Sequence, residues 1–361
     1  MDKLTVVIAP DSFKGSLSAT EAAASIAEGW RSHRPDDGLL VLPQADGGEG
    51  TIDAIEYSIP GSWRQSAGLV TGPDGTPVHG EWLNLPDGTA VVELAQMSGL
   101  PLMGALDPIG ATTTGLGEVM ANAIDSGVER MIVGLGGSAS TDGGMGALAA
   151  LGNRRPPPGG VRILTDVDAP LLGPAGAAAV FAPQKGADAE DVAALEQRLA
   201  EVARQLGTDP TRPGTGAAGG AAYGLQHWGG VIESGAAFIA ELTGLDIAIS
   251  HADQAVTGEG RFDSQSTGGK LVGHVITQAR RNDVPIVVIA GSVDFGIDLP
   301  RTAQTHSLVD LAGTLDAALA DPRRWLRVAG NRAARRVLDT ADLADTARTD
   351  VESRNSSNSE A

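Results

Sequence analysis

The stretch LTVVIAPDSFKGSLSA, residues 4–19, carries the pattern that decides the fold of this chain. Its first six residues form a continuous apolar run of strand length, which is typical of a strand buried on both faces. A polar loop over 10–16 follows, and a helix extends from it to about Arg34. Another apolar run comes at 39–42. The opening of the chain therefore predicts a strand–helix–strand unit of a parallel α/β sheet.

The pattern changes after about residue 60 and returns near residue 252. Between 66 and 94, short segments of alternating polarity are separated by two Pro-Asp-Gly turns, which favours an antiparallel meander. From about 252, a strand, a loop, a helix and a last strand follow in order. The first and last thirds of the chain are therefore expected to form one domain, interrupted by the middle third.

We predict an α/β protein of two domains. The first is a Rossmann-like domain with a parallel sheet, and the second is an α/β domain inserted into it, with an antiparallel or mixed sheet. The tail is polar and rich in serine and asparagine, so it is predicted to be disordered. The expected bounds are 1–65 with 250–340 for the discontinuous domain, 66–249 for the insertion and 341–361 for the tail.

Length, charge and cysteine content narrow the class of protein. The chain has 361 residues, a formal net charge of -19 and no cysteine. This acidity argues against a nucleic-acid partner or an anionic membrane surface, and the missing cysteines exclude disulfides and thiolate metal sites. No apolar run approaches the roughly 18–20 residues that span a bilayer, and the N-terminus lacks the features of a signal peptide. We expect a cytoplasmic protein that acts on small molecules.

Open α/β sheets bind ligands at the carboxyl ends of their strands, so the polar loops there are the first candidates for a site. The loop after the first strand offers Asp11, Ser12 and Lys14. The loop after the strand at 39–42 places Asp46 and Glu49 among three glycines. Two carboxylates in a flexible loop suit a magnesium ion, which keeps several waters and takes one or two carboxylates.

Two further loops and one lysine complete the candidate set. The loop 134–144 contains Gly136, Gly137, Ser138 and Asp142, and its backbone N–H groups could form an anion-binding concavity. A fourth loop begins at Gly258 and is expected to carry an acid, an arginine and a lysine. Its candidates are Arg261, Asp263 and Lys270, and a separate segment contributes Lys185.

Several well-known motifs are absent. The Gly269-Lys270 pair lacks the first glycine and the final serine or threonine of a phosphate-binding P-loop. The glycine loop has Ala139 where a dinucleotide-binding fingerprint ends in glycine. The six histidines show no zinc-binding spacing, and no serine stands in the elbow motif of hydrolases. Phosphoryl transfer without a P-loop remains the favoured chemistry.

Six motifs, taken in order, resemble the bacterial type-1 glycerate kinase family. The resemblance covers about residues 4–340 and implies two α/β domains, with ATP, Mg²⁺ and D-glycerate as ligands. The loop GGSASTDGG differs from the usual family pattern at Ser140 and Thr141, and residues 165–170 also differ. The six motifs are APDSFKGSLSA (9–19), ADGGEGT (45–51), GLGGSASTDGGMG (134–146), FAPQKGA (181–187), PGTGAAGG (213–220) and TGEGRFDSQSTGGK (257–270).

Within that resemblance, charge and chemistry assign roles to the candidates. Asp142 is expected to orient or deprotonate the acceptor hydroxyl. Lys14 is also predicted to be a catalytic residue, and the two begin the catalytic set. Asp46 and Asp263 belong to that set too, and with Glu49 they are the candidates for Mg²⁺. Candidates for binding substrate or phosphate are Asp11, Ser12, Gly136, Gly137, Ser138, Lys185, Arg261 and Lys270.

Some alternatives stay open at this point. The resemblance favours 2-phosphoglycerate over 3-phosphoglycerate as the product. A kinase for another small hydroxy acid or sugar, such as a galactokinase-like enzyme, would use similar loops. A metabolite-binding regulator on a kinase scaffold would retain the fold without turnover. A homo-oligomer is compatible with everything in the sequence.

Overall fold

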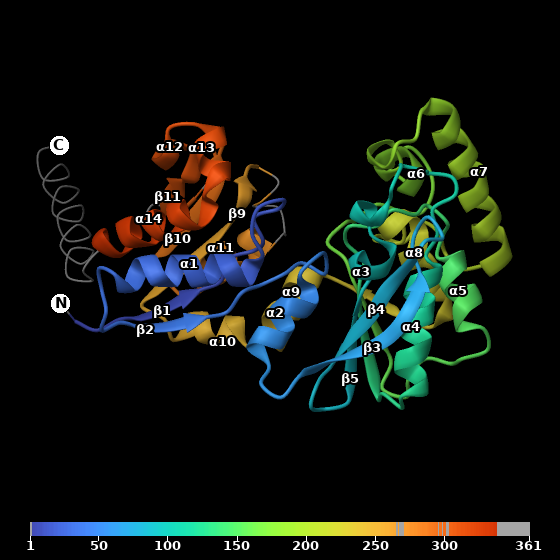
Figure 1. Cartoon of the computed structure of the whole chain (residues 1–361), viewed down its shortest axis with the longest axis horizontal. Helices are drawn as coiled ribbons and strands as arrows, with labels where there is room; N and C mark the ends of the chain where they lie inside the picture. The colour runs from blue at the N-terminus through green and yellow to red at the C-terminus, as the bar shows by residue number, and fades with distance from the viewer. Residues whose placement is uncertain are drawn as a thin grey trace, which may run out of the picture.

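The computed structural model describes residues 2–264, 266, 271–294, 296–297, 299–300 and 303–337. These residues form two β-sheets, each covered by helices on both faces, and Figure 1 shows the two sheets side by side along the long axis. Among the described residues, none of the helices combines the length and the apolar character that would let it cross a lipid bilayer. Lys270 and the tail 341–361 lie outside the described residues.

The first sheet has five strands, and every neighbouring pair in it is parallel. The segment 6–8 of its interior strand β1 (Thr5–Ile8) is fully buried, as the apolar run at the start of the chain predicts. The first and last parts of the chain thus pair directly, because β1 lies between β2 and β9. In spatial order the strands are β11 (Gln304–Ser307), β10 (Ile286–Val293), β9 (Gln254–Phe262), β1 (Thr5–Ile8) and β2 (Gly38–Val41).

Helices cover both faces of this first sheet. The helix that follows β1 begins with a capping box, in which Ser18 and Glu21 each bond the other's backbone N–H. Its apolar face, with Ile26 and Trp30, packs together with three C-terminal helices. On that face lie α1 (Ala19–Arg31), α12 (Leu308–Ala312), α13 (Leu315–Ala320) and α14 (Pro322–Arg335). The opposite face is covered by α10 (Leu245–Ser250) and α11 (Leu271–Arg281).

The second sheet has six strands and is mixed. Its first three strands form the antiparallel meander, with the turn glycines Gly75 and Gly88 at positive φ. The remaining pairs are parallel. In order the strands are β3 (Trp63–Thr71), β4 (Pro77–Asn84), β5 (Thr89–Glu93), β6 (Arg130–Gly134), β7 (Val161–Leu164) and β8 (Val231–Glu233). The predicted α/β fold with one parallel and one mixed sheet is therefore confirmed.

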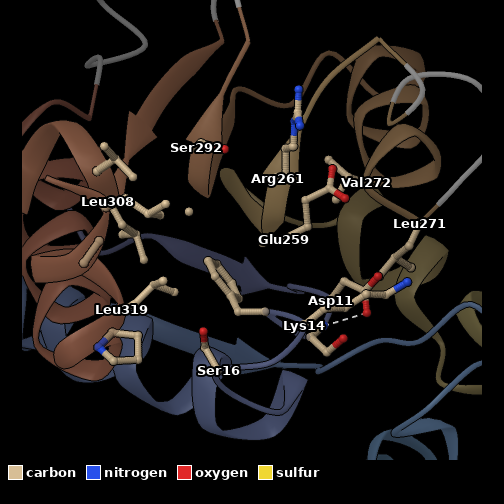
Figure 2. A pocket seen from close by; sticks show the side chains of 18 of the residues that line it. Asp11, Lys14, Ser16, Glu259, Arg261, Leu271, Val272, Ser292, Leu308 and Leu319 are labelled. Carbon is tan, nitrogen blue, oxygen red and sulfur yellow. Dashed lines mark hydrogen bonds between the residues drawn. The ribbon is translucent and has the colours of Figure 1, made fainter. Parts of the chain in front are cut away.

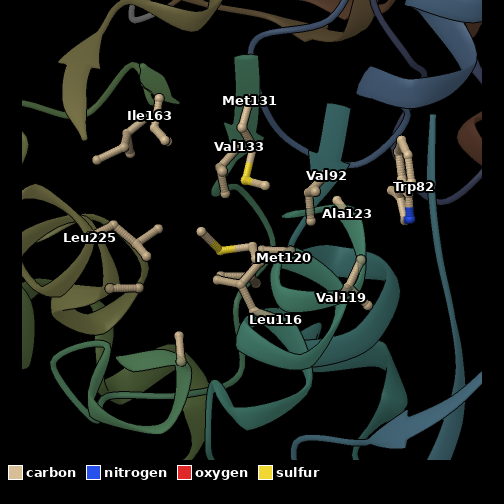
Figure 3. Close-up of a cluster of buried hydrophobic side chains, with 14 of the residues drawn as sticks. Trp82, Val92, Leu116, Val119, Met120, Ala123, Met131, Val133, Ile163 and Leu225 are labelled. Carbon is tan, nitrogen blue, oxygen red and sulfur yellow. The ribbon is translucent and has the colours of Figure 1, made fainter. Parts of the chain in front are cut away.

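One face of the second sheet carries the largest apolar core. Figure 3 shows Leu116 and Met120 of one helix facing Met131 and Val133 of β6, with Leu225 beside them. The helices on this face are α3 (Ala95–Ser98), α4 (Thr114–Asp125), α5 (Met145–Leu151) and α8 (Ala217–Trp228). A smaller core joins α8 to α6 (Ala177–Phe181) and α7 (Ala189–Leu206). The two short 3₁₀ helices are η1 (Leu100–Leu102) and η2 (Pro183–Lys185).

Two helices lie between the sheets (Figure 1). They are α2 (Thr51–Ser58), which follows β2 of the first sheet, and α9 (Gly235–Leu242). The buried side chains of Ile52 and Ile55 pack against Val91 and Ile132 of the second sheet, together with Ile239 of α9. A chain segment that leaves the first sheet is thus anchored on the second. The domain bounds at 65/66 and 249/250 stay a prediction.

One sequence interpretation is wrong in its local structure. The segment from Gly258 was expected to be a loop, but β9 continues to Phe262 and pairs with β10 as far as Val293. Close packing of the two backbones explains the glycines, since a Cβ on Gly258 would lie 1.9 Å from the Ile289 carbonyl oxygen. Gly258 therefore allows close strand pairing, and the polar loop begins only at Asp263.

Candidate active site

A cavity of about 390 Å³ opens at the carboxyl ends of the first sheet. The loop after β1 forms one wall, and the end of β9 and helices α12 and α13 form the others. Figure 2 shows Leu308 and Leu319 on one side of this space, and Asp11, Lys14 and Glu259 on the other. The cavity thus has an apolar end and a charged end, and we name it the first cavity.

Three carboxylates gather at the charged end of the first cavity. They belong to Asp11, Asp46 and Glu259, which come from three different strand ends. Burial, and then the negative charges of Asp46 and Glu259, raise the pKa of Asp11 to about 7. The backbone N–H of Ser12, 2.6 Å from the Asp11 carboxylate, and the Lys14 ammonium oppose this rise. A cation bound here would relieve the repulsion between the acids.

This donor set is compatible with magnesium. In the part of the chain that the structure describes, no three acidic or histidine side chains converge on a single metal position. A hydrated Mg²⁺ needs only one or two carboxylates, because water and phosphate oxygens complete its shell. Asp46 and Asp11 provide that number on one side of the loop after β2, and Glu49 lies on its other side. The residues present therefore fit the ion.

A larger cavity, of about 550 Å³, lies on the other side of the loop after β1. We name it the second cavity. Its lining contains several charged and hydroxyl side chains and comes from segments next to both sheets, including Glu49 before α2, Glu93 at the end of β5 and Gly137 of the glycine loop. The side chain of Arg64 also faces it while forming ion pairs with acids of α2 and β4. Both cavities are lined by Ser12, Lys14 and Ser16.

The loop after β2 connects the two cavities, with Asp46 lining the first and Glu49 the second. Two backbone N–H groups at its end, those of Gly50 and Ile52, donate to the Glu93 carboxylate at 3.0 Å each. Glu93 is 2% exposed, and this burial raises its pKa to about 7 despite the two bonds. The loop is thereby attached to the end of a strand of the second sheet.

The glycine loop after β6 divides into a packed part and an exposed part. Gly136 donates its N–H to the Gly47 carbonyl at 3.1 Å, and a Cβ on it would lie 2.4 Å from Gly48 Cα. Close packing between two loops therefore requires this glycine. Gly137, by contrast, lines the second cavity with a φ of +77°. Part of the predicted anion-binding loop thus faces the cavity, and part packs inside the protein.

The charged residues tied to the glycine loop are buried. Asp142 is 3% exposed, and its carboxylate accepts four hydrogen bonds from Thr113, Gly144 and Gly146. Lys185 is 2% exposed and donates to the Ser138 hydroxyl at 2.9 Å and to the Ser140 carbonyl. Burial lowers the pKa of Lys185 to about 8, against the attraction of Asp142. Among the described residues that line the two cavities, neither of these charged residues occurs.

The segment predicted as the last loop contributes Glu259, Gly260 and Arg261 to the first cavity. Arg261 lines that cavity and forms ion pairs with Asp294 at 2.9 Å and with Asp263 at 3.7 Å. The backbone N–H of Asp263 donates to the hydroxyl of Ser266 at 3.1 Å. Asp263 thus contacts Arg261, which lines the first cavity, and is not itself among the described lining residues. The predicted Lys270 lies outside the described residues.

Sequence reasoning missed several lining residues. Glu93 could have been found by the rule used for the other loops, since it is the acid that directly ends the apolar strand TAVVE. Glu259 was included in a quoted motif but received no role. Arg64 and the apolar wall of α12 and α13 had no local signal, because exposed arginines and short leucine-rich helices are common in any α/β protein.

Comparisons with known proteins agree on one family. The model of the "Glycerate kinase family" matches residues 6–156 and 159–338. A Bacillus subtilis protein named glycerate kinase is 39% identical, covering 80% of this chain and 85% of its own. An Escherichia coli protein named glycerate 2-kinase is 36% identical, covering 87% and 93%. A solved structure from Salmonella typhimurium LT2, provisionally described as glycerate kinase 2, superimposes with a TM-score of 0.75 at 34% identity, covering 92% and 98%.

Proposed function

Because the chain belongs to the glycerate kinase family, we propose that it transfers the γ-phosphoryl group of ATP to the 2-hydroxyl of D-glycerate. The observation that carries this proposal is the pair of cavities that share Ser12, Lys14 and Ser16. A phosphoryl-transfer enzyme must bring a nucleotide and an acceptor together at one point. Two cavities that share one polar loop, with a lysine in it, satisfy that requirement.

We assign the nucleotide to the first cavity. Its apolar wall, with Leu308, Leu315 and Leu319, suits a flat and weakly polar base such as adenine. The phosphates would then extend toward the loop after β1, where Lys14 offers a positive charge. When bound there, Mg²⁺ would neutralise phosphate charge, with Asp46 as its first candidate ligand and Asp11 or Glu49 beside it.

The second cavity is the proposed place for D-glycerate. It offers the ammonium of Lys14 and the backbone at Gly137 for the substrate's carboxylate. The acceptor hydroxyl oxygen attacks the γ-phosphorus, the bond from that phosphorus to the bridging oxygen breaks, and ADP leaves. Lys14 would stabilise the negative charge on the transferring group because it lies where the cavities meet.

Two carboxylates are candidates for the group that receives the hydroxyl proton. The sequence favours Asp142, but its oxygens already accept four hydrogen bonds inside the protein. Those contacts favour a role in orienting the glycine loop. Asp11 lines the first cavity next to Ser12, which lines both cavities, and its carboxylate could accept the proton if Asp46 and Glu49 hold the ion. Asp11 is therefore the second candidate.

Phosphorus NMR of the reaction tests this proposal directly. Purified protein with Mg-ATP and D-glycerate should yield ADP and the signal of 2-phosphoglycerate. A signal of 3-phosphoglycerate would contradict only the position of transfer. Calorimetric binding of glycerate without any product would point to a metabolite-binding regulator and overturn the kinase proposal. A cytoplasmic location belongs to the same proposal and is checked by cell fractionation.

A further inference from the structure

The carboxylate of Glu93 lies where the end of β5 meets the start of α2 at the wall of the second cavity. It ends β5 of the second sheet, it is 2% exposed, and it lines the second cavity. Its oxygens accept the N–H groups of Gly50 and Ile52 at 3.0 Å each. Burying a carboxylate costs free energy unless it is well bonded. The two backbone bonds offset part of this cost.

Helix α2 depends on this carboxylate for its N-terminus. The residue before the helix is Gly50, with a φ of +88° and no side chain that could cap the first N–H groups. A helix start usually satisfies these groups with a serine, threonine or aspartate of its own segment. Here Glu93 satisfies two of them from a different sheet. It therefore fixes where the helix begins.

The loop before α2 carries one acid into each cavity. Asp46 lines the first cavity and Glu49 the second. The rest of the loop touches the second sheet through glycine backbones, with the Gly47 carbonyl accepting from Gly136. Among the described residues, Glu93 supplies the two hydrogen bonds that tie the end of the loop next to Glu49 to the second sheet, while the buried side chain of Ile52 anchors the first turn of α2 in the apolar core. A shift of this end would displace both acids from the positions that the cavities require.

We infer that Glu93 is a positioning residue that holds the loop Asp46–Gly50 and so sets the geometry of both ligand sites at once. This inference rests on the proposed assignment of a nucleotide and an acceptor to the two cavities. It adds a role for a residue of the second sheet that does not itself transfer the phosphoryl group. Glu93 acts through Asp46 and Glu49.

The matched control is Glu118, a second carboxylate that accepts two hydrogen bonds from another element. Its oxygens bond the N–H of Thr71 at 2.6 Å and the Thr71 hydroxyl at 2.9 Å. Glu118 is not among the described residues that line either cavity. Glu93→Gln and Glu118→Gln make the same chemical change, and each disturbs two bonds. A purely structural role would give both variants the same outcome.

The experiment measures the dissociation constants of Mg-ATP and D-glycerate by calorimetry, and kcat and both KM values, for the wild type and the two variants. We expect Glu93→Gln to weaken binding of both ligands about tenfold, as is found for residues that orient ligand-binding groups. Glu118→Gln should leave both constants within about twofold. Thermal melting of each variant reports the accompanying loss of stability.

Each outcome decides the inference. Weakening of both ligands in Glu93→Gln alone supports it. The inference would be overturned if the affinities of Glu93→Gln were unchanged, if the variant bound only one of the two ligands more weakly, or if both variants showed equal effects. If Glu93→Gln does not fold, Glu93→Asp keeps the charge but shortens the reach, and the same readouts then decide. If the wild-type protein binds both ligands but forms no product, the proposed function is refuted. The dissociation constants of the variants would then still test the role of Glu93.

Discussion

Two loops of similar composition follow interior strands of the two sheets, but one is exposed to the cavities and the other is largely buried. The loop after β1 spans 9–18, and the glycine loop after β6 spans 135–144. Each contains glycine, serine and an aspartate. In the first, Lys14 is exposed and belongs to both cavities. In the second, Asp142 is buried and accepts four hydrogen bonds.

The difference lies in what surrounds each loop. The loop after β1 has open space on two sides, so its polar groups meet solvent or ligand. The glycine loop is enclosed by the loop after β2 and by the start of α8, where a Cβ on Gly219 would lie 2.1 Å from the Ser140 carbonyl oxygen. The comparison teaches that a glycine-rich motif can contact ligand or permit close packing, and that the neighbours decide which.

The largest expected effect concerns activity in the loop after β1. Lys14→Ala should lower kcat/KM by about 100-fold or more, because it removes a positive charge where the transferring phosphoryl group would lie. Its melting temperature should stay within about 2 °C of the wild type, since the side chain is exposed. Steady-state kinetics and thermal melting check both statements. Lys3→Ala, a change at an exposed lysine away from the cavities, should match the wild type in both.

The next effect concerns stability in the glycine loop. Asp142→Asn replaces an acceptor of four hydrogen bonds with a group that places N–H donors against backbone N–H groups. The free energy of unfolding should fall by about 3 kcal/mol, measured by urea denaturation. A large drop in kcat without a loss of stability would instead show that Asp142 is the base that the sequence favours, and the contrast between the loops would fail.

Glycine substitutions sharpen the contrast further. Gly136→Ala should destabilise the protein by about 2–3 kcal/mol, because its Cβ would collide with the Gly48 backbone at 2.4 Å. Gly15→Ala should cost about 1 kcal/mol, from its φ of +75° alone, since nothing lies within 4 Å of the new Cβ. Denaturation curves of the two variants give the comparison. Equal losses would mean that packing does not distinguish the loops.

The smallest effect is a pH dependence of stability without ligands. The pKa of Glu93 rises from 4.5 to about 7 on folding, so the folded state holds its proton over that interval while the unfolded state releases it. The free energy of unfolding should therefore fall as the pH rises from about 5.5 to 8, by about 1–2 kcal/mol. Melting across this range in wild type and in Glu93→Gln tests it, since the variant should show a shallower dependence. A rise in stability with pH would contradict the sign.

Much of the fold was accessible from local patterns. The apolar runs before Pro10 and at 39–42 form strands where the sequence predicts them. The loop containing Asp11 and Lys14 was predicted to lie at a strand end and does so. The error at Gly258 shows the limit, because a glycine in a closely paired strand has the same local sequence as a glycine in a loop.

From the sequence alone we could predict the strand–helix–strand order, the sheet edge at which ligands are expected and, through six ordered motifs, the family. Those features depend on residues near one another in the chain. The packing of distant segments was needed to establish that Asp142 and Lys185 are buried, that Glu93 bonds the start of α2, and that Lys14 lines both cavities. Burial and contact between segments about 30 or more residues apart depend on how the elements pack, and no local pattern encodes that packing.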